Sequence, residues 1–477
     1  MRDATPVCYF DITDVVSYAV ANTRVSGIQR VQLNLLAHMV RRHGGHAVRC
    51  TFEHPHDRVM VEIDPSALLQ HDEFDADLML RQLGLAGTSR IFPSKPRVRR
   101  YLRRYSGRNV RRAIAKAGIH LAALFAPQRL ARMGLHRPSA AELAAVPIQQ
   151  TRIDRLPVDC PFVCLGAVWS LPRIMAFARE HAERGGRVVQ LVYDLIPQVH
   201  PEYFAGDLAE DFNRWLAEIV RYTRHFICIS QSTATDLRRF VGPRDDIRIH
   251  AVAMAHEFVG FERFAAVTLQ DSDVLEAASA PFVLCVGTLE VRKNGAALLQ
   301  AWRRLRERLG ERLPRLVFAG KQGWLIHEFN ATLANDPALA QRVRIVDSPS
   351  DRQLAFLYQK CMFTVFPSLY EGWGLPVGEA AWFGKYVISS NATSLPEVCG
   401  DLIDYFDPSD AELLCTCIER AVTQPAYVRA REEVIARSPM RLWSDVADDI
   451  HRFIVMRDDA PRAATARHDH VADRIDS

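Results

Sequence analysis

Short apolar runs that alternate with helical patterns restrict the folds open to this chain more than any other feature. In the first half such runs occupy residues 7–12, 161–165, 187–193, 225–229 and 247–252, and in the second half 281–286, 315–319, 343–346, 362–366, 386–389 and 402–406. This alternation is typical of βαβ units, in which crossover helices join parallel strands. Because 477 residues are too many for one ordinary core, we expect an α/β protein of two such domains.

The expected domains follow the two series of apolar runs. We predict an N-terminal Rossmann-like domain over residues 1–260 with a basic insertion at about 88–150, a C-terminal domain over 277–440, a helix over 441–456 that packs back on the N-terminal domain, and a flexible tail over 457–477. The Ala-, Ser- and Asp-rich stretch between the two series has weak periodicity, so the interdomain connection is placed there.

The composition is that of an ordinary soluble protein, with 48% hydrophobic and 24% charged residues. The ten cysteines form no CxxC pair and several lie inside apolar runs, so we expect buried free thiols in a reducing compartment. The start of the chain lacks the apolar stretch of a signal peptide, and no run approaches the roughly 20 apolar residues of a membrane span. These features predict a cytoplasmic protein.

One segment, residues 90–116, is strongly basic. It holds eleven Lys or Arg residues and no acid: Arg90, Lys95, Arg97, Arg99, Arg100, Arg103, Arg104, Arg108, Arg111, Arg112 and Lys116. The apolar run 119–125 follows it. A solvated insertion explains this pattern, and so does a surface over residues 90–125 for anionic lipid head groups on the inner face of a membrane or for a pyrophosphate-linked acceptor. Nucleic acid is disfavoured, because no aromatic residues interleave with the charges as in a known binding motif.

A glycine loop with two carboxylates carries the strongest chemical signal. The stretch from Glu371 to Glu379 reads EGWGLPVGE and follows an apolar run, so it begins where a parallel strand ends. Ligands bind at that edge of open α/β sheets. Gly372 and Gly374 let the backbone approach a ligand, and a helix over 379–383 is expected to begin at Glu379.

A second motif places two cations after another predicted strand. Gly287 follows the apolar run 281–286, and the basic pair Arg292–Lys293 comes five residues later in GTLEVRKN. Basic side chains at such a turn can stabilise the negative charge of a departing diphosphate.

The two motifs together resemble those of family-4-type retaining glycosyltransferases of the GT-B fold. The resemblance implies two facing Rossmann-like domains with an interdomain cleft, in which Glu371 contacts the donor sugar, Glu379 the ribose, and Arg292 and Lys293 the diphosphate. It implies Arg292, Lys293 and Glu371 as catalytic residues, and as donor-binding residues Gly287, Gly372, Trp373, Gly374, Leu375 and Glu379. Trp373 stands where the family more often has Phe.

The N-terminal half resembles the same family less closely. Arg24 and Gly27 lie in a stretch similar to the first glycine loop, which faces the cleft. Asp194 lies in YDLIP, where Tyr193 replaces a His that usually precedes the Asp. We therefore expect Arg24, Gly27 and Asp194 on the acceptor side.

No metal or cofactor is expected. DxD-like strings occur at 75–77 and 271–273, but neither follows a predicted strand, so both are interpreted as solvated acids. No carboxylate in the N-terminal half stands as a clear nucleophile, so the resemblance favours front-face attack, with the departing phosphate taking the acceptor proton.

The resemblance implies transfer of a hexose, with a preference for mannose, from a GDP- or UDP-linked donor to a saccharide or lipid-linked acceptor in bacterial surface polysaccharide synthesis. Two alternatives stay open: a sugar-nucleotide epimerase, for which we identify no acid–base set, and a non-catalytic nucleotide-sugar-binding protein.

Overall fold

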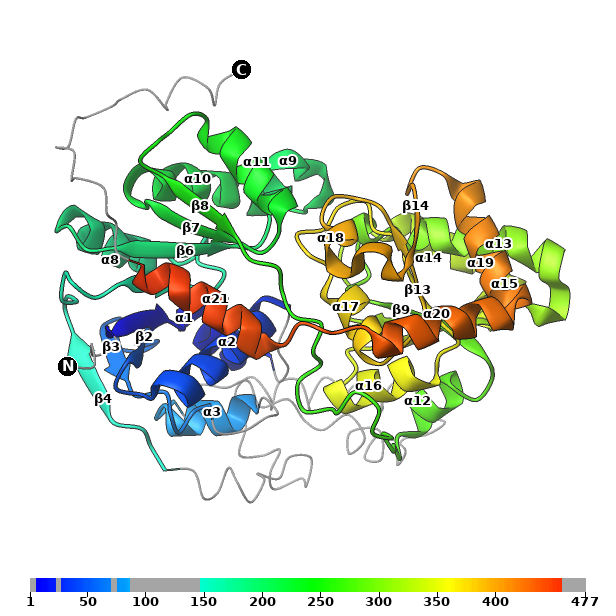
Figure 1. Ribbon diagram of the computed structural model, residues 1–477, viewed down its shortest axis with the longest axis horizontal. Coiled ribbons are helices and arrows are strands. Elements are labelled where there is room, and N and C mark those ends of the chain that lie inside the picture. The colour runs from blue at the N-terminus through cyan, green and yellow to red at the C-terminus, as the bar shows by residue number, and fades with distance from the viewer. Residues whose placement is uncertain (1–5, 23–26, 70–74, 86–145, 457–477) are drawn as a thin grey trace, which may run out of the picture. The chain divides into compact units, whose positions relative to one another are not determined.

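The computed structural model describes residues 6–22, 27–69, 75–85 and 146–456 (Figure 1). The chain forms two compact units. Unit 1 comprises residues 1–156 and 166–168, and unit 2 comprises residues 157–165 and 169–477. The basic segment 90–116 and the apolar run 119–125 lie outside the described residues. The division into domains at about residue 260 stays a prediction.

Unit 1 contains a small mixed sheet. Strand β1 (Cys8–Asp11) pairs in parallel with β2 (Val48–Glu53), which continues antiparallel to β3 (Met60–Ile63) and then β4 (Gln150–Ile153). Its described helices are α1 (Thr13–Ala21), α2 (Gly27–His43) and α3 (Ala76–Gln82). Strand β1 was predicted from its apolar run. Strands β2, β3 and β4 were not predicted.

The first part of unit 2 is a parallel sheet with the order β5-β6-β7-β8. Its strands are β5 (Phe162–Cys164), β6 (Val188–Val192), β7 (His225–Cys228) and β8 (Arg248–Ala251). Its helices are α8 (Pro172–Glu183), α9 (Ile196–Val199), the short 3₁₀ helix η2 (Pro201–Tyr203), α10 (Leu208–Tyr222) and α11 (Gln231–Val241). All four strands lie within the predicted apolar runs, and β5, β6 and β7 are fully buried.

The second part of unit 2 is a six-stranded parallel sheet with the order β11-β10-β9-β12-β13-β14. The strands are β9 (Phe282–Val286), β10 (Arg315–Gly320), β11 (Val343–Asp347), β12 (Thr364–Phe366), β13 (Val387–Ser390) and β14 (Asp404–Phe406). Numbered from β9, this order is 3-2-1-4-5-6, that of the dinucleotide-binding doubly wound fold. The predicted α/β class with parallel sheets is confirmed.

Helices cover both faces of this sheet (Figure 1). They are α12 (Ser272–Ala277), η3 (Val291–Lys293), α13 (Gly295–Leu309), η4 (Gly310–Arg312), α14 (His327–Asn335), α15 (Pro337–Arg342), α16 (Asp351–Lys360), α17 (Leu375–Trp382), α18 (Leu395–Cys399), η5 (Gly400–Leu402), α19 (Ala411–Thr423) and α20 (Pro425–Arg437). Leu298 and Trp302 of α13 and Ile418 of α19 share one fully buried core with Leu316 of β10 and Val365 of β12. This packing holds the strand ends that carry the motifs.

The last described helix, α21 (Trp443–Val455), contacts the first sheet of unit 2. The Trp443 amide donates to the Glu257 carboxylate over 2.9 Å. Phe453 stacks on His250 with ring centroids 5.0 Å apart, and Arg187 donates to the Ile454 carbonyl over 2.9 Å. The chain therefore returns to strands β6 and β8 after the C-terminal sheet.

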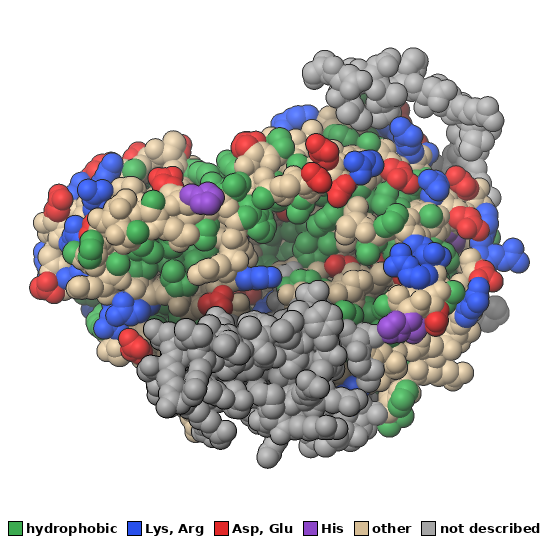
Figure 2. Space-filling model, turned by 180° about the vertical axis from the view of Figure 1, so that it is seen from behind, with side chains coloured by type: hydrophobic (Ala, Val, Ile, Leu, Met, Phe, Trp, Pro, Cys, Tyr) green, Lys and Arg blue, Asp and Glu red, His purple; other side chains and the backbone are tan. Residues whose placement is uncertain are grey.

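Three further observations bear on the sequence-based expectations. All ten cysteines are free thiols, and all but Cys160 are buried. Within the described ranges, no helix is both long enough and apolar enough to span a membrane. On the face drawn in Figure 2, the coloured surface shows basic and acidic side chains interspersed, in keeping with the net charge of +4.

Candidate functional site

The two motifs meet where the strand order of the second sheet reverses. Strands β9 and β12 are neighbours, and the loops that follow them leave the same edge of the sheet. The Leu369 amide donates to the Arg292 carbonyl over 2.9 Å, which joins the two loops directly. A reversal of this kind leaves a crevice at the carboxyl ends of the strands, where doubly wound folds bind their ligands.

A buried carboxylate at this point holds two cations. One Glu371 oxygen accepts from Lys293 Nζ over 2.6 Å, and the other accepts from Arg292 Nη1 over 2.7 Å. Arg292 also donates to the Tyr370 carbonyl over 2.7 Å and, through Nη2, to Glu290 over 2.6 Å. Glu371 is 7% exposed and Glu290 6%. The structure therefore brings together the three residues predicted to be catalytic and adds Glu290.

The opposite charges of this cluster stabilise each other's ionised forms. Burial raises the pKa of Glu371, but the opposite charges of Arg292 and Lys293 outweigh it and hold the pKa at about 2. Burial lowers the pKa of Arg292, and the charges of Glu371, Glu290 and Asp194 more than reverse this. The carboxylate and the guanidinium are thus both ionised at neutral pH.

Thr393 and Ser394, which follow β13, form hydrogen bonds with the backbone of Glu371. Thr393 Oγ1 accepts from the Glu371 amide over 3.0 Å and donates to its carbonyl over 2.8 Å. Ser394 Oγ lies 2.9 Å from the Glu371 carbonyl and 3.0 Å from the Trp373 carbonyl. Sequence analysis did not single out Thr393 and Ser394. The available signal was their place just after a predicted parallel strand.

The backbone of the loop requires glycine at two positions. A Cβ at Gly372 would lie 2.2 Å from the Tyr193 carbonyl oxygen, so no larger residue fits there without a shift of backbone. Gly374 has φ +112° and directly precedes Leu375, the first residue of α17. Trp373 is 3% exposed, so its ring is buried rather than open to solvent.

The predicted helix start at Glu379 is wrong. Helix α17 begins at Leu375, so Glu379 lies one turn inside it. Pro376 within the first turn and the positive φ of Gly374 explain the earlier start, since proline favours the beginning of a helix. Glu379 is 8% exposed, and the Tyr358 hydroxyl donates to its Oε2 over 3.0 Å.

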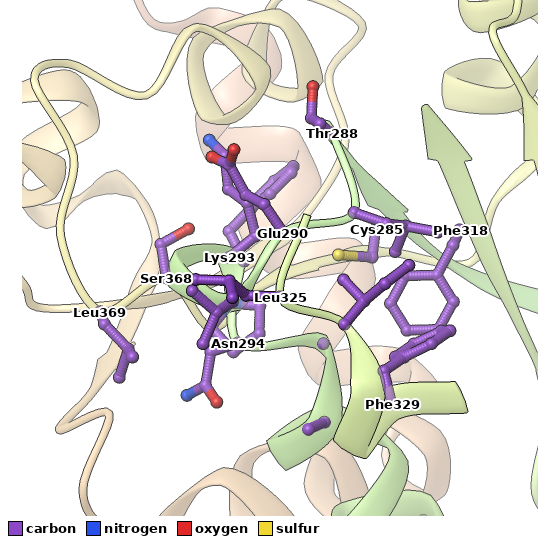
Figure 3. Close-up of a pocket in the computed structure, with 18 of the residues that line it drawn as sticks. Cys285, Thr288, Glu290, Lys293, Asn294, Phe318, Leu325, Phe329, Ser368 and Leu369 are labelled. Atoms are coloured by element: carbon purple, nitrogen blue, oxygen red, sulfur yellow. The ribbon is translucent and has the colours of Figure 1, made fainter. Parts of the chain in front are cut away.

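A cavity of about 200 Å³ opens beside the ion-pair cluster. Figure 3 shows Glu290 and Lys293 on one side of it and Phe318 and Phe329 on the other. The two rings meet edge to face with centroids 5.1 Å apart. Gly287 also lines the cavity. The cavity thus has a charged wall and an apolar wall, both formed by the second sheet of unit 2 and its loops.

Of the residues expected on the acceptor side, Asp194 lies at this site. It is half-buried, and burial raises its pKa against the lowering effect of Arg292. The hydroxyl of Tyr193 donates to the Leu165 carbonyl over 2.7 Å. Tyr193 is 9% exposed, so its side chain is buried against the first sheet of unit 2.

The roles of the other two acceptor-side residues stay predictions. Gly27 begins α2 in unit 1. Arg24 lies outside the described residues.

Both DxD-like strings begin helices. Asp75 accepts from the amides of Asp77 and Leu78 at the start of α3, and Asp271 accepts from those of Asp273 and Val274 at the start of α12. These are helix N-caps. Among the described residues, no group of three or more His, Cys, Asp or Glu is placed to hold a metal ion.

Comparison with known proteins defines the class of domain. Residues 269–438, which contain the whole ion-pair cluster, match the model of the family described as "Glycosyl transferases group 1". The resemblance to glycosyltransferases that the sequence motifs predicted is therefore confirmed over this part of the chain.

Curated relatives are bacterial mannosyltransferases. The chain is 32% identical over 266 residues to the serotype-specific mannosyltransferase WbdA of Escherichia coli, a match over 55% of this chain and 32% of WbdA. It is 30% identical over 252 residues to the O-antigen chain mannosyltransferase B of Escherichia coli, over 53% of this chain and 64% of that protein. The chain thus spans about a third of WbdA, the larger relative.

Solved structures confirm the fold. The crystal structure of Anabaena Alr3699/HepE in complex with UDP and glucose is similar, with a TM-score of 0.51 at 12% identity, over 93% of this chain and 97% of that chain. The complex of the same protein with UDP-glucose gives a TM-score of 0.50. The predicted GT-B fold of two Rossmann-like domains is confirmed.

The ion pairs of Glu371 predict a defined pH dependence of stability. Its pKa falls from 4.5 to about 2 on folding, so its stabilising contribution is complete above about pH 4.5 and is lost as the pH falls through about 2. Urea unfolding of the Glu371→Gln variant should therefore differ most from wild type at pH 7 and progressively less below pH 4.5. The exposed Glu433→Gln is the control. An equal difference at pH 7 and pH 3 would contradict this account.

Proposed function

We propose that the chain is a retaining, metal-independent hexosyltransferase that transfers mannose from a nucleotide diphosphate sugar to a saccharide acceptor in bacterial surface polysaccharide synthesis. The observation that carries the proposal is the buried Glu371 carboxylate, paired with Arg292 and Lys293 at the β9–β12 reversal inside the glycosyltransferase group 1 domain. Its mannosyltransferase relatives support mannose and the polysaccharide setting. The bound UDP and glucose in Anabaena Alr3699/HepE support a nucleotide-sugar donor.

The chemistry follows from the positions of the charges. The cavity beside Lys293 would receive the donor, with its diphosphate against the basic pair and its sugar towards Glu371. The acceptor oxygen attacks the anomeric carbon on the face that the diphosphate leaves, the bond from that carbon to the phosphate oxygen breaks, and the departing phosphate takes the acceptor proton. Negative charge grows on the diphosphate as this bond breaks, so the cations stabilise the transition state more than the ground state.

Both cations have a carboxylate partner within the site. Lys293 and Arg292 each lie within 2.7 Å of a Glu371 oxygen. A donor diphosphate therefore competes with an ionised carboxylate for the same two groups. When Lys293 and Arg292 bind the diphosphate instead, the Glu371 oxygens can accept hydrogen bonds from sugar hydroxyls.

The test is a transfer assay with GDP-mannose and with UDP-linked hexoses, using a mannose oligosaccharide as the acceptor. We expect release of GDP and an α-linked product, whose anomeric configuration is determined by NMR. A β-linked product would overturn retention. Epimerisation of the donor would favour a sugar-nucleotide epimerase instead. Binding of the donor without turnover would favour a non-catalytic nucleotide-sugar-binding protein.

Loss of the Lys293 charge should weaken transfer while the fold survives. In the same assay we expect Lys293→Ala to lower kcat/KM by roughly tenfold to a thousandfold, the range for removal of one electrostatic donor. Lys321→Ala is the control, since Lys321 is exposed and follows the same kind of strand end. Turnover like that of wild type in Lys293→Ala would remove Lys293 from the mechanism.

Chelation should leave transfer intact, because the stabilising charges come from side chains. We expect EDTA at millimolar concentration to change the rate of transfer by less than about twofold, a difference of less than about 0.4 kcal/mol in the barrier. Loss of activity that Mg²⁺ or Mn²⁺ restores would show that the enzyme depends on a metal.

We further propose that the protein is cytoplasmic and binds the inner face of the membrane through residues 90–125, a part of the proposal that rests on the sequence alone. Eleven cations should favour anionic vesicles, and added salt should release the protein because exposed charges are screened. Co-sedimentation with phosphatidylserine and phosphatidylcholine vesicles tests this. Equal binding to both kinds, or to neither, would favour a solvated insertion.

A further inference from the structure

A group of aromatic rings lies on loops of unit 2 next to the donor cavity. The indole of Trp324, after β10, has its centroid 6.2 Å from that of Phe204, and its Nε1 donates to the Tyr203 carbonyl over 2.7 Å. His200 stacks on Tyr203 at 4.9 Å and meets Tyr370 edge-on at 5.1 Å. We call these five residues the aromatic platform.

The indole at its centre is both exposed and fixed in orientation. All seven tryptophans lie in the described residues, and Trp324 is the most exposed of them, with 36% of its surface open. A large ring left in water carries a cost in apolar hydration. Its hydrogen bond to Tyr203 restrains the ring, so less side-chain freedom is lost when a ligand stacks on it. An exposed but preorganised aromatic ring is suited to binding.

The platform is continuous with the donor cavity along the chain. Leu325, directly after Trp324, lines that cavity, as Figure 3 shows. The amide of Gly323, directly before Trp324, donates to the Leu289 carbonyl over 2.8 Å. This hydrogen bond joins the Trp324 loop to the loop after β9 that carries the basic pair. At the other end of the platform, Tyr370 directly precedes Glu371. A ligand on the platform would therefore border the bond that is broken in the donor.

Polar groups around the rings define the kind of ligand. The Glu202 carboxylate is 61% exposed and lies 2.9 Å from His200 Nδ1. The Tyr370 hydroxyl donates to Asp236, which Arg239 also contacts at 3.2 Å. A sugar ring presents an apolar C–H face and a rim of hydroxyls, so it can cover an aromatic face while its hydroxyls donate to carboxylates. An apolar partner would remove water from these charged groups without giving them new hydrogen bonds in exchange.

We propose that the aromatic platform binds a sugar ring of the saccharide acceptor, with Trp324 as the stacking surface. This inference rests on the proposed transferase function and deepens it, because it names where the acceptor lies. The face of Trp324 sets the plane of the acceptor ring, and Glu202 selects among hydroxyls at its edge. Trp324 is thus a specificity-determining residue rather than one that touches the reacting atoms.

The experiment compares Trp324→Ala with Trp324→Phe, which keeps a ring. Phe264→Ala is the matched control, since Phe264 is an aromatic residue that is 66% exposed away from these loops. We expect Trp324→Ala to raise the KM for a mannose oligosaccharide about tenfold, as for loss of a single aromatic anchor, with a much smaller change in kcat. Trp324→Phe should recover part of the loss. The melting temperature of each variant with GDP checks its folding.

A second readout keeps this inference separate from the transferase proposal. Saturation-transfer NMR measures binding of the same mannose oligosaccharide without any donor, and we expect the signal to be lost in Trp324→Ala and kept in Phe264→Ala. Equal acceptor KM values and equal NMR signals in wild type and Trp324→Ala would overturn the platform and leave transfer intact. If the wild-type protein turned over no donor, the transferase proposal would be overturned. The NMR comparison by itself would then test whether the aromatic platform binds a saccharide.

Discussion

The paired charges of Glu371 are the interaction on which the arrangement of the site depends. A carboxylate that is 7% exposed is stable in its ionised form here only because Arg292 and Lys293 both lie within 2.7 Å of it. Removing any one of the three would leave the other two charges with fewer opposite charges nearby, which costs more than the loss of an exposed pair. The loops after β9 and β12 are therefore held in one relative position, and Thr393, after β13, completes it.

The same cluster links stability to chemistry. Charges that are preorganised towards one another are also preorganised towards a diphosphate, which presents the same kind of oxygen as a carboxylate. Asp194 adds a third acid near Arg292, and burial raises its pKa. The neighbouring Tyr193 donates its hydroxyl to the Leu165 carbonyl, so its side chain supports the first sheet of unit 2.

Prediction from sequence succeeded and failed for identifiable physical reasons. Strand β9 is buried along its whole length and reads as a continuous apolar run, so it was found to within one residue. Strand β4, with Thr151 and Arg152 exposed in an antiparallel edge pair, has no such run and was missed. Helix α17 was placed too late, although Pro376 marks a first turn.

By itself the sequence determined the fold class and the two motifs, because hydrophobic periodicity and glycine placement are local properties of the chain. Only the tertiary structure decided that Glu371 pairs with both Arg292 and Lys293, 79 and 78 residues away, and that Trp324 rests on Tyr203, 121 residues away. Contacts over such separations depend on strand order and on the reversal between β9 and β12, which no local pattern encodes.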